Sequence, residues 1–114
     1  MPFLRIQTNH PLNEADARSL ASSSSALVAE QLGKPENYVM TSVENNPAMQ
    51  FAGSDEPLAY LELKSIGLPE SKTGDFSAAL AALLNRHLGL PADRVYIEFA
   101  DAPRAMWGWN GGTF

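Results

Sequence analysis

Hydrophobic and polar residues alternate in three short stretches of the chain, residues 3–8, 58–65 and 94–99, and this period of two predicts half-buried strands. Residues 38–43 are predicted to form a further strand. One side of these strands carries the apolar positions that we expect to face a core, namely Leu4, Ile6, Ala59, Leu61, Leu63, Val95, Ile97 and Phe99.

Two longer stretches repeat their hydrophobic residues with the period of a helix, at about residues 13–32 and 76–88. Asn13 is the expected N-cap of the first helix, and glycines follow both helices at positions 33 and 89. The apolar stripe of the first helix consists of Leu20, Leu27, Val28 and Leu32. The serine run at 22–25 lies mainly between these positions, so we expect it to face solvent.

The chain contains an internal repeat with an offset of 56 positions. This offset places Leu32-Gly33-Lys34-Pro35 on Leu88-Gly89-Leu90-Pro91, and it places residues 2–8 on residues 58–64. The two copies fall at about 2–44 and 58–100, and each reads as a β-α-β unit. We therefore predict one domain over residues 1–114, of the α+β class, with a four-stranded sheet and both helices on one face.

One face of this sheet would have no helices to cover it. It carries a mixture of aromatic and charged residues: Arg5, Gln7, Tyr60, Glu62, Lys64, Arg94, Tyr96 and Glu98. Either water covers this face, or other subunits pack on it around a symmetry axis. The C-terminal segment 107–114 is rich in aromatic residues, so we expect it to pack or pair with another part of the fold.

Composition narrows the classes of function. The 114 residues carry a net charge of −5, which argues against nucleic acid as a partner. The absence of cysteine excludes disulfides, thiolate zinc sites and cysteine nucleophiles, and two distant histidines do not suggest a metal site. No apolar run reaches the ~20 residues that span a bilayer, and the start lacks the features of a secretory signal. We therefore expect a cytoplasmic protein without a membrane contact.

Short motifs along the whole chain keep the order and nearly the spacing of a known family. They are Met1-Pro2-Phe3-Leu4, Thr8-Asn9, Gly33-Lys34-Pro35, Gly53-Ser54, Glu56-Pro57, Lys64-Ser65-Ile66-Gly67, Asp93-Arg94-Val95-Tyr96-Ile97, Gly108-Trp109-Asn110 and Thr113-Phe114. Through them the chain resembles the macrophage migration inhibitory factor family of the tautomerase superfamily, more than its D-dopachrome tautomerase branch. The resemblance implies a homotrimer with active sites between subunits, and keto-enol tautomerisation by an N-terminal proline without a cofactor.

Pro2 is the catalytic base that this resemblance implies, provided that Met1 is removed. A proline at a free N-terminus is a secondary amine with a basic lone pair, whereas a proline that follows Met1 is a peptide amide. Burial in an apolar pocket and a nearby cation both lower the pKa of such an amine toward neutrality. Lys34 is the implied cation and would also hold the carboxylate of an α-keto acid substrate.

The resemblance also implies the remaining residues of the site. Ser65 and Ile66 would contact substrate through the main chain, and Tyr96 would reach the pocket from a neighbouring subunit together with the residue at position 98. The residues expected to line the pocket are Phe3, Tyr38, Lys64, Trp107, Trp109 and Phe114. For each aromatic residue, ordinary packing in the core or at an interface is the alternative.

Several positions depart from the family pattern. Leu58 and Leu61 replace the Cys-x-x-Cys of mammalian members, which excludes thiol oxidoreductase activity. Glu98 replaces an asparagine and would repel an anionic substrate unless it is paired or protonated. Trp107 replaces a valine and would narrow the pocket, and Lys64 replaces a histidine. We expect activity on phenylpyruvate-like enols and weak or no activity on dopachrome esters.

Two other functions remain open at this point. In the first, the protein is a cytokine-like signalling or binding module whose pocket is vestigial or serves for docking; its receptor is not identifiable from the sequence. The family resemblance allows non-classical secretion in that case. In the second, the protein is a structural trimer whose pocket has no function, a reading motivated by Glu98 and Trp107.

Overall fold

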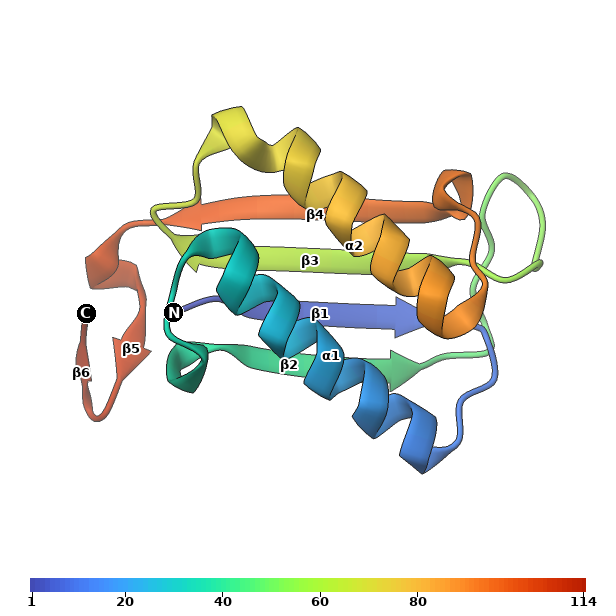
Figure 1. Cartoon of the computed structure of the whole chain (residues 1–114), viewed down its shortest axis with the longest axis horizontal. Coiled ribbons are helices and arrows are strands. Elements are labelled where there is room, and N and C mark those ends of the chain that lie inside the picture. The colour runs from blue at the N-terminus through green and yellow to red at the C-terminus, as the bar shows by residue number, and fades with distance from the viewer.

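The computed structural model describes all residues 1–114 and contains two β-α-β units followed by a short hairpin. Both helices lie on one face of a four-stranded sheet (Figure 1), so the α+β class predicted from the sequence is confirmed. The elements in chain order are β1 (Phe3–Thr8), α1 (Glu14–Leu32), β2 (Met40–Asn45), β3 (Ala59–Ile66), α2 (Thr73–Leu88), β4 (Val95–Ala102), β5 (Gly108–Trp109) and β6 (Gly112–Thr113). No helix is long and apolar enough to cross a membrane.

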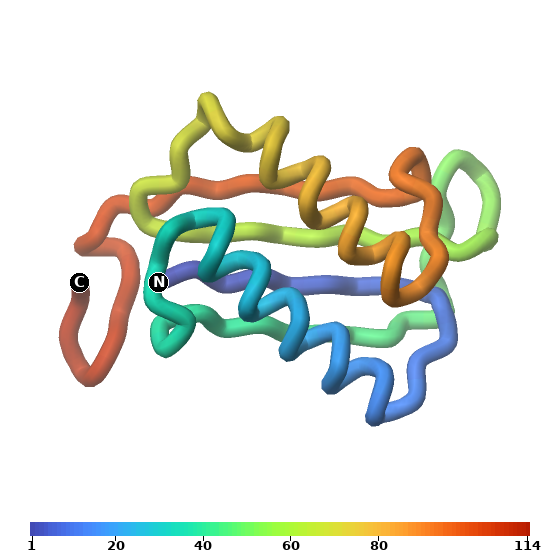
Figure 2. Tube along the Cα trace, viewed as in Figure 1, coloured from blue at the N-terminus to red at the C-terminus, as the bar shows by residue number.

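The sheet has the strand order β2-β1-β3-β4, which places the first strand of each unit in the centre. Within each unit the two strands are parallel, and β1 and β3 join the units in an antiparallel pair. Leu4 lies opposite Leu63 in this pair, and Ile6 lies opposite Leu61. All four are buried against the helices, as the alternating pattern predicts. The trace in Figure 2 shows the central strands beneath the two helices.

The repeat seen in the sequence has a structural counterpart. Gly33 and Gly89, which lie 56 positions apart, both end their helices in the left-handed conformation, with φ of 61° and 68°. A short 3-10 turn follows each glycine, at Glu36–Tyr38 and Ala92–Arg94, before the second strand of the unit begins. The two halves of the chain therefore use the same sequence of local structures.

Helix α1 begins as expected but buries one residue that we placed in solvent. Asn13 caps it, because its side chain accepts a hydrogen bond from the amide of Asp16 at 2.7 Å. The prediction that the whole serine run 22–25 faces solvent is wrong for Ser24, which is fully buried. Ser24 lies four residues from both Leu20 and Val28 on the apolar stripe, and its hydroxyl is satisfied by the carbonyl of Ala21 at 3.0 Å.

Three predicted boundaries are also corrected. Tyr38 belongs to the 3-10 turn after Pro35 rather than to a strand, and β2 begins at Met40. Helix α2 starts at Thr73, three residues earlier than expected, and includes the glycine at 74 in its first turn. Strand β4 continues to Ala102, beyond its hydrophobic alternation, because pairing with β3 extends that far.

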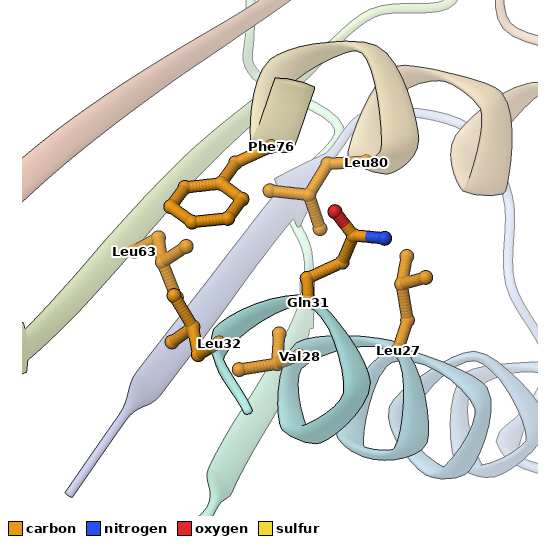
Figure 3. Close-up of a pocket in the computed structure, with 7 residues that line it drawn as sticks. All are labelled: Leu27, Val28, Gln31, Leu32, Leu63, Phe76 and Leu80. Carbon is orange, nitrogen blue, oxygen red and sulfur yellow. The ribbon is translucent and has the colours of Figure 1, made fainter. Parts of the chain in front are cut away.

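A small hollow lies between α1, α2 and β3 (Figure 3). It is lined by Leu27, Val28, Gln31, Leu32, Leu63, Phe76 and Leu80. Its volume of about 10 Å³ is at the lower limit for a single water molecule, and its walls are almost entirely apolar. This hollow is a gap in packing and has no room for a substrate.

Candidate active site

Pro2 is held at the start of the central strand β1, where its side chain is fully buried. The amide of Met40 donates a hydrogen bond to the carbonyl of Pro2 at 3.0 Å, which continues the parallel pairing of β1 with β2. On the other side of β1, Phe3 pairs with Lys64 of β3. The position of Pro2 is therefore fixed by main-chain contacts and does not depend on a mobile end.

An open cleft of about 220 Å³ lies beside Pro2, at the end of the sheet where both chain termini are found (Figure 1). Five of the residues that we predicted to line a pocket meet Pro2 there. Most of the lining is hydrophobic, and its residues are Met1, Pro2, Phe3, Asn37, Tyr38, Val39, Met40, Trp107, Gly108, Trp109 and Phe114. The size and character of the cleft suit a small, largely apolar ligand.

Three aromatic rings form the outer wall of this cleft and attach the C-terminal hairpin to the fold. Trp109 stacks on Phe114 with ring centroids 5.4 Å apart, and Tyr38 meets both rings edge-on at 5.6 and 6.0 Å. Strands β5 and β6 pair with each other, and the amide of Phe114 bonds to the carbonyl of Trp107 at 3.2 Å. The expectation that the aromatic tail packs or pairs is confirmed.

Lys34 lies just after the glycine that ends α1 and reaches the end of β3. Its Nζ donates hydrogen bonds to Oγ of Ser65 at 3.1 Å and to the carbonyl of Ile66. Its own amide bonds to the carbonyl of Ala29 at 3.0 Å, which fixes the main chain at this point. The structure thus brings together the three predicted binding residues Lys34, Ser65 and Ile66, although they do not line the cleft beside Pro2.

The electrostatic influence of Lys34 extends to the chain terminus in the cleft. The pKa of the Met1 amine is lowered, first because the amine is partly buried and second because the positive charge of Lys34 is near. Burial also lowers the pKa of Lys34 itself, while Asp101 opposes this change and Arg104 adds to it. An amino group at this end of β1 is therefore easier to keep in its neutral, basic form than a solvated one.

Tyr96 lies far from Pro2 within one chain. The register places Phe3 beside Lys64 and Lys64 beside Ala100, so these three residues lie in one row across the sheet. Tyr96 precedes Ala100 by four residues and therefore lies about 13 Å from this row along the strand direction, away from the cleft. It is 65% exposed and borders a different hollow of about 380 Å³. One chain therefore does not bring Tyr96 to the cleft.

Lys64 and Glu98 lie on the uncovered sheet face, and both have partners there. Lys64 is 3.5 Å from Glu62, which also approaches Arg5 at 3.6 Å. Glu98 accepts a hydrogen bond from the hydroxyl of Tyr60 at 2.6 Å, which raises the pKa of Tyr60 to about 12. The predicted carboxylate at position 98 is thus paired with a neutral donor.

The sequence did not indicate several residues that shape this region. Asn37, Val39 and Met40 line the cleft because β2 runs parallel to β1 and starts beside Pro2. A prediction that β2 pairs with β1 would have placed these residues beside Pro2. Asp101 at the end of β4 and Arg104 in the 3-10 turn that follows both influence Lys34, and no motif pointed to either residue.

A duplicated β-α-β fold with a proline buried at its second position agrees with the resemblance to the tautomerase superfamily. A family model described as "Macrophage migration inhibitory factor (MIF)" matches residues 1–114, and the chain belongs to that family. It is 42% identical to a macrophage migration inhibitory factor homolog of Brugia malayi, over 100% of this chain and 99% of that protein.

Solved structures agree with this assignment. The crystal structure of a homologue from Prochlorococcus marinus has a TM-score of 0.92 at 48% sequence identity and covers 98% of both chains. The structure of the factor from Trichinella spiralis has a TM-score of 0.89 at 38% identity, and covers 98% of this chain and 99% of that one. The similarity therefore extends over the sheet, both helices and the C-terminal hairpin.

Proposed function

We propose that this protein is a keto-enol tautomerase that acts on phenylpyruvate-like α-keto acids, with Pro2 as the general base after removal of Met1. The observation that carries this proposal is the burial of Pro2 beside an apolar cleft, near the positive charge of Lys34. These are the two influences that lower the pKa of an amine. Both influences favour the neutral form of a secondary amine at this position, and the neutral form can accept a proton.

In the proposed reaction, the Pro2 nitrogen takes a proton from the carbon next to the substrate's carbonyl group. The electron pair of the broken C–H bond moves to the carbonyl oxygen, and the proton is then delivered to this oxygen to give the enol. The reverse sequence converts the enol into the ketone. Positive charge and hydrogen-bond donors lower the barrier most where the negative charge develops.

Lys34 is the group that we assign to hold the carboxylate of the substrate. Its ammonium has three N–H donors, of which Ser65 and Ile66 accept two. The third donor remains for a substrate oxygen. The contacts to Ser65 and Ile66 also restrict the long side chain of Lys34, so less conformational entropy is lost when substrate binds.

We further propose that the protein acts as a homotrimer with its active sites between subunits. Support comes from the exposed position of Tyr96, which lies about 13 Å along the strand direction from the row that contains Phe3, and farther still from Pro2. The uncovered sheet face and the unpaired edges of β2 and β4 offer surfaces for such an assembly. In a trimer, Tyr96 of one subunit would complete the cleft of the next.

Two residues set the expected substrate range. Trp107 narrows the cleft, and Glu98 adds negative charge on the strand that carries Tyr96. We therefore expect phenylpyruvate to be a better substrate than dopachrome esters. A thiol oxidoreductase activity is not proposed, because the chain contains no cysteine.

The decisive experiment combines the intact mass of the protein with a phenylpyruvate ketonisation assay on the same sample. We expect the mass of the chain without Met1, together with activity that Pro2→Gly reduces at least about a hundredfold, as is usual for loss of a general base. Pro11→Gly is a matched control at an exposed position and should retain activity. Full activity in a chain that still carries Met1 would refute the mechanism.

A cytokine-like binding role is the second candidate, and one surface feature favours it. Met40, Met106 and Trp109 are 65%, 77% and 53% exposed around the C-terminal hairpin and the cleft, and exposed apolar groups of this size often mark contact surfaces. In this case, binding to a cell-surface partner would survive the Pro2→Gly substitution. Loss of binding and turnover together would instead assign both to the cleft.

A further inference from the structure

Arg94 makes an unusual set of contacts with the loop that precedes β3. Its guanidinium donates to four main-chain carbonyls, and it lies in the 3-10 turn just before β4. The acceptors and distances are Phe51 at 2.7 Å, Glu56 at 2.7 Å, Ser54 at 3.2 Å and Pro57 at 3.4 Å. A planar group with five fixed donors suits this arrangement, and a lysine could not reproduce it.

The loop held by Arg94 contains a tight turn with a strained residue. Phe51 and Ser54 exchange two main-chain hydrogen bonds, of 2.9 and 3.0 Å. The two residues between them have positive φ, 53° at Ala52 and 72° at Gly53, which is the pattern of a type I′ turn. Glycine adopts this conformation readily, whereas the Cβ of Ala52 disfavours it. Contacts from outside the turn are needed to keep it in place, and Arg94 provides them.

The turn places the ring of Phe51 between Arg94 and Tyr96. The Arg94 guanidinium carbon lies 5.3 Å from the centre of the Phe51 ring, within the range of a cation–π contact. On the side of the sheet, the Phe51 and Tyr96 rings are 4.5 Å apart. Arg94 thus holds both the main chain and the ring of Phe51, and Phe51 is the aromatic neighbour of Tyr96.

We propose that Arg94 is a positioning residue that fixes Phe51 against Tyr96, so that the two rings form an aromatic wall for the substrate's ring. This inference rests on the proposed function, in which Tyr96 faces the cleft of a neighbouring subunit. Tyr96 is 65% exposed, and its ring contact with Phe51 limits where its ring can lie before substrate binds. The wall selects aromatic α-keto acids over aliphatic ones, since an aliphatic side chain gains little from an ordered ring face.

The first test compares Arg94→Gln with wild type on phenylpyruvate and on 2-oxobutanoate, by the exchange of hydrogen at carbon 3 with deuterium from solvent. For phenylpyruvate we expect KM to rise about three- to tenfold, the value of one aromatic contact, with kcat nearly unchanged. For 2-oxobutanoate neither constant should change. A loss of kcat on both substrates, or no change on either, would overturn the proposal.

Three further variants separate positioning from general damage. Phe51→Leu removes the ring but none of the carbonyls that bind Arg94, and it should raise the KM for phenylpyruvate as much as Arg94→Gln. The double variant should be no worse than either single variant, because both remove the same wall. Arg86→Gln, at an exposed arginine of α2, is the matched control and should behave as wild type. Additive effects of the two substitutions would contradict a shared role.

Hydrogen exchange tests the role of Arg94 without reference to turnover. Arg94→Gln should accelerate exchange at the amides of Phe51 and Ser54, while the amides of β1 should remain protected. Ala52→Gly relieves the strained position and should restore part of the lost protection in the Arg94→Gln background. Unchanged exchange in Arg94→Gln would overturn the positioning role. Wild-type protein without activity on any α-keto acid would overturn the proposed function and the substrate wall, while the exchange data would still decide whether Arg94 fixes the turn.

Discussion

Lys34 and Ser65 are joined by a hydrogen bond of 3.1 Å between Nζ and Oγ, although 31 positions separate them in the chain. This bond links the end of α1 to the end of β3, and therefore links the two β-α-β units beside the cleft. Ser65 is fully buried, so its hydroxyl has a fixed place from which to hold the ammonium group. The fold therefore fixes the position of the Lys34 ammonium group.

Replacement of Lys34 by glutamine should change the pH dependence of turnover. The positive charge of Lys34 lowers the pKa of the Met1 amine, so removal of that charge should raise the pKa of the Pro2 amine that replaces it at the chain terminus. The neutral amine is the active form, and the acid limb of the kcat/KM profile should therefore move to higher pH. KM for phenylpyruvate should also rise, about tenfold for the loss of one charged contact.

The matched control for this prediction is Lys72→Gln, at an exposed lysine that precedes α2 and has no assigned role. Its pH profile should match that of wild type. If Lys34→Gln raises KM but leaves the acid limb in place, Lys34 binds substrate without influencing the base.

Substitution of Glu98 by glutamine should be visible in the titration of Tyr60. The hydrogen bond to Glu98 is the largest cause that raises the pKa of Tyr60 to about 12 from an ordinary value of 10.0. The phenol of Tyr60 binds its proton more tightly in the folded protein than in the unfolded chain. The hydrogen bond therefore stabilises the fold fully below pH 10.0, and this contribution is lost as the pH rises through about 12. In Glu98→Gln the pKa should fall toward 10.0, as measured by phenolate absorbance.

The same substitution bears on substrate preference. Removal of a negative charge from the strand of Tyr96 should lower KM for anionic substrates about two- to fivefold, as expected for a partly exposed charge. Glu30→Gln, at an exposed position of α1, serves as the control. A Tyr60 titration that stays near pH 12 in Glu98→Gln would show that another group causes the shift.

Replacement of Trp107 by valine should widen the cleft and relax its selectivity. Trp107 lines the cleft but takes no part in the stack of Tyr38, Trp109 and Phe114, so the hairpin should stay attached. We expect kcat/KM for a dopachrome ester to rise about tenfold, with a smaller change for phenylpyruvate. An unchanged ratio between the two substrates would show that Trp107 does not limit access.

Alternation and repetition were sufficient to predict most of the fold. The strands 3–8 and 58–65 were located closely because each has one buried face, which fixes both its position and its register. Boundaries were missed where another influence outweighs hydrophobicity. Pro35 starts a 3-10 turn that removes Tyr38 from β2, and pairing with β3 prolongs β4 beyond its apolar residues.

The site was predicted less completely than the fold, because its residues come from distant segments. The family resemblance named Lys34, Ser65 and Ile66, and the structure places them in contact. The family resemblance could not indicate that Glu98 pairs with Tyr60, since that contact depends on the register of β3 with β4. The contacts of Arg94 could not be predicted from the sequence either, because its four acceptors are main-chain carbonyls, which every residue type has.

The two β-α-β units share a scaffold, but only the first carries the proposed base Pro2 and the cation Lys34. At the offset of 56, Leu58 occupies the place of Pro2 and Leu90 the place of Lys34, and both leucines are buried in apolar surroundings. A polypeptide has one amino end, so the second unit cannot present a secondary amine whatever residue it carries there. Duplication therefore gives the chain two equivalent frameworks and a single reactive end, while the second framework supplies Ser65, Ile66 and Tyr96 to the proposed site.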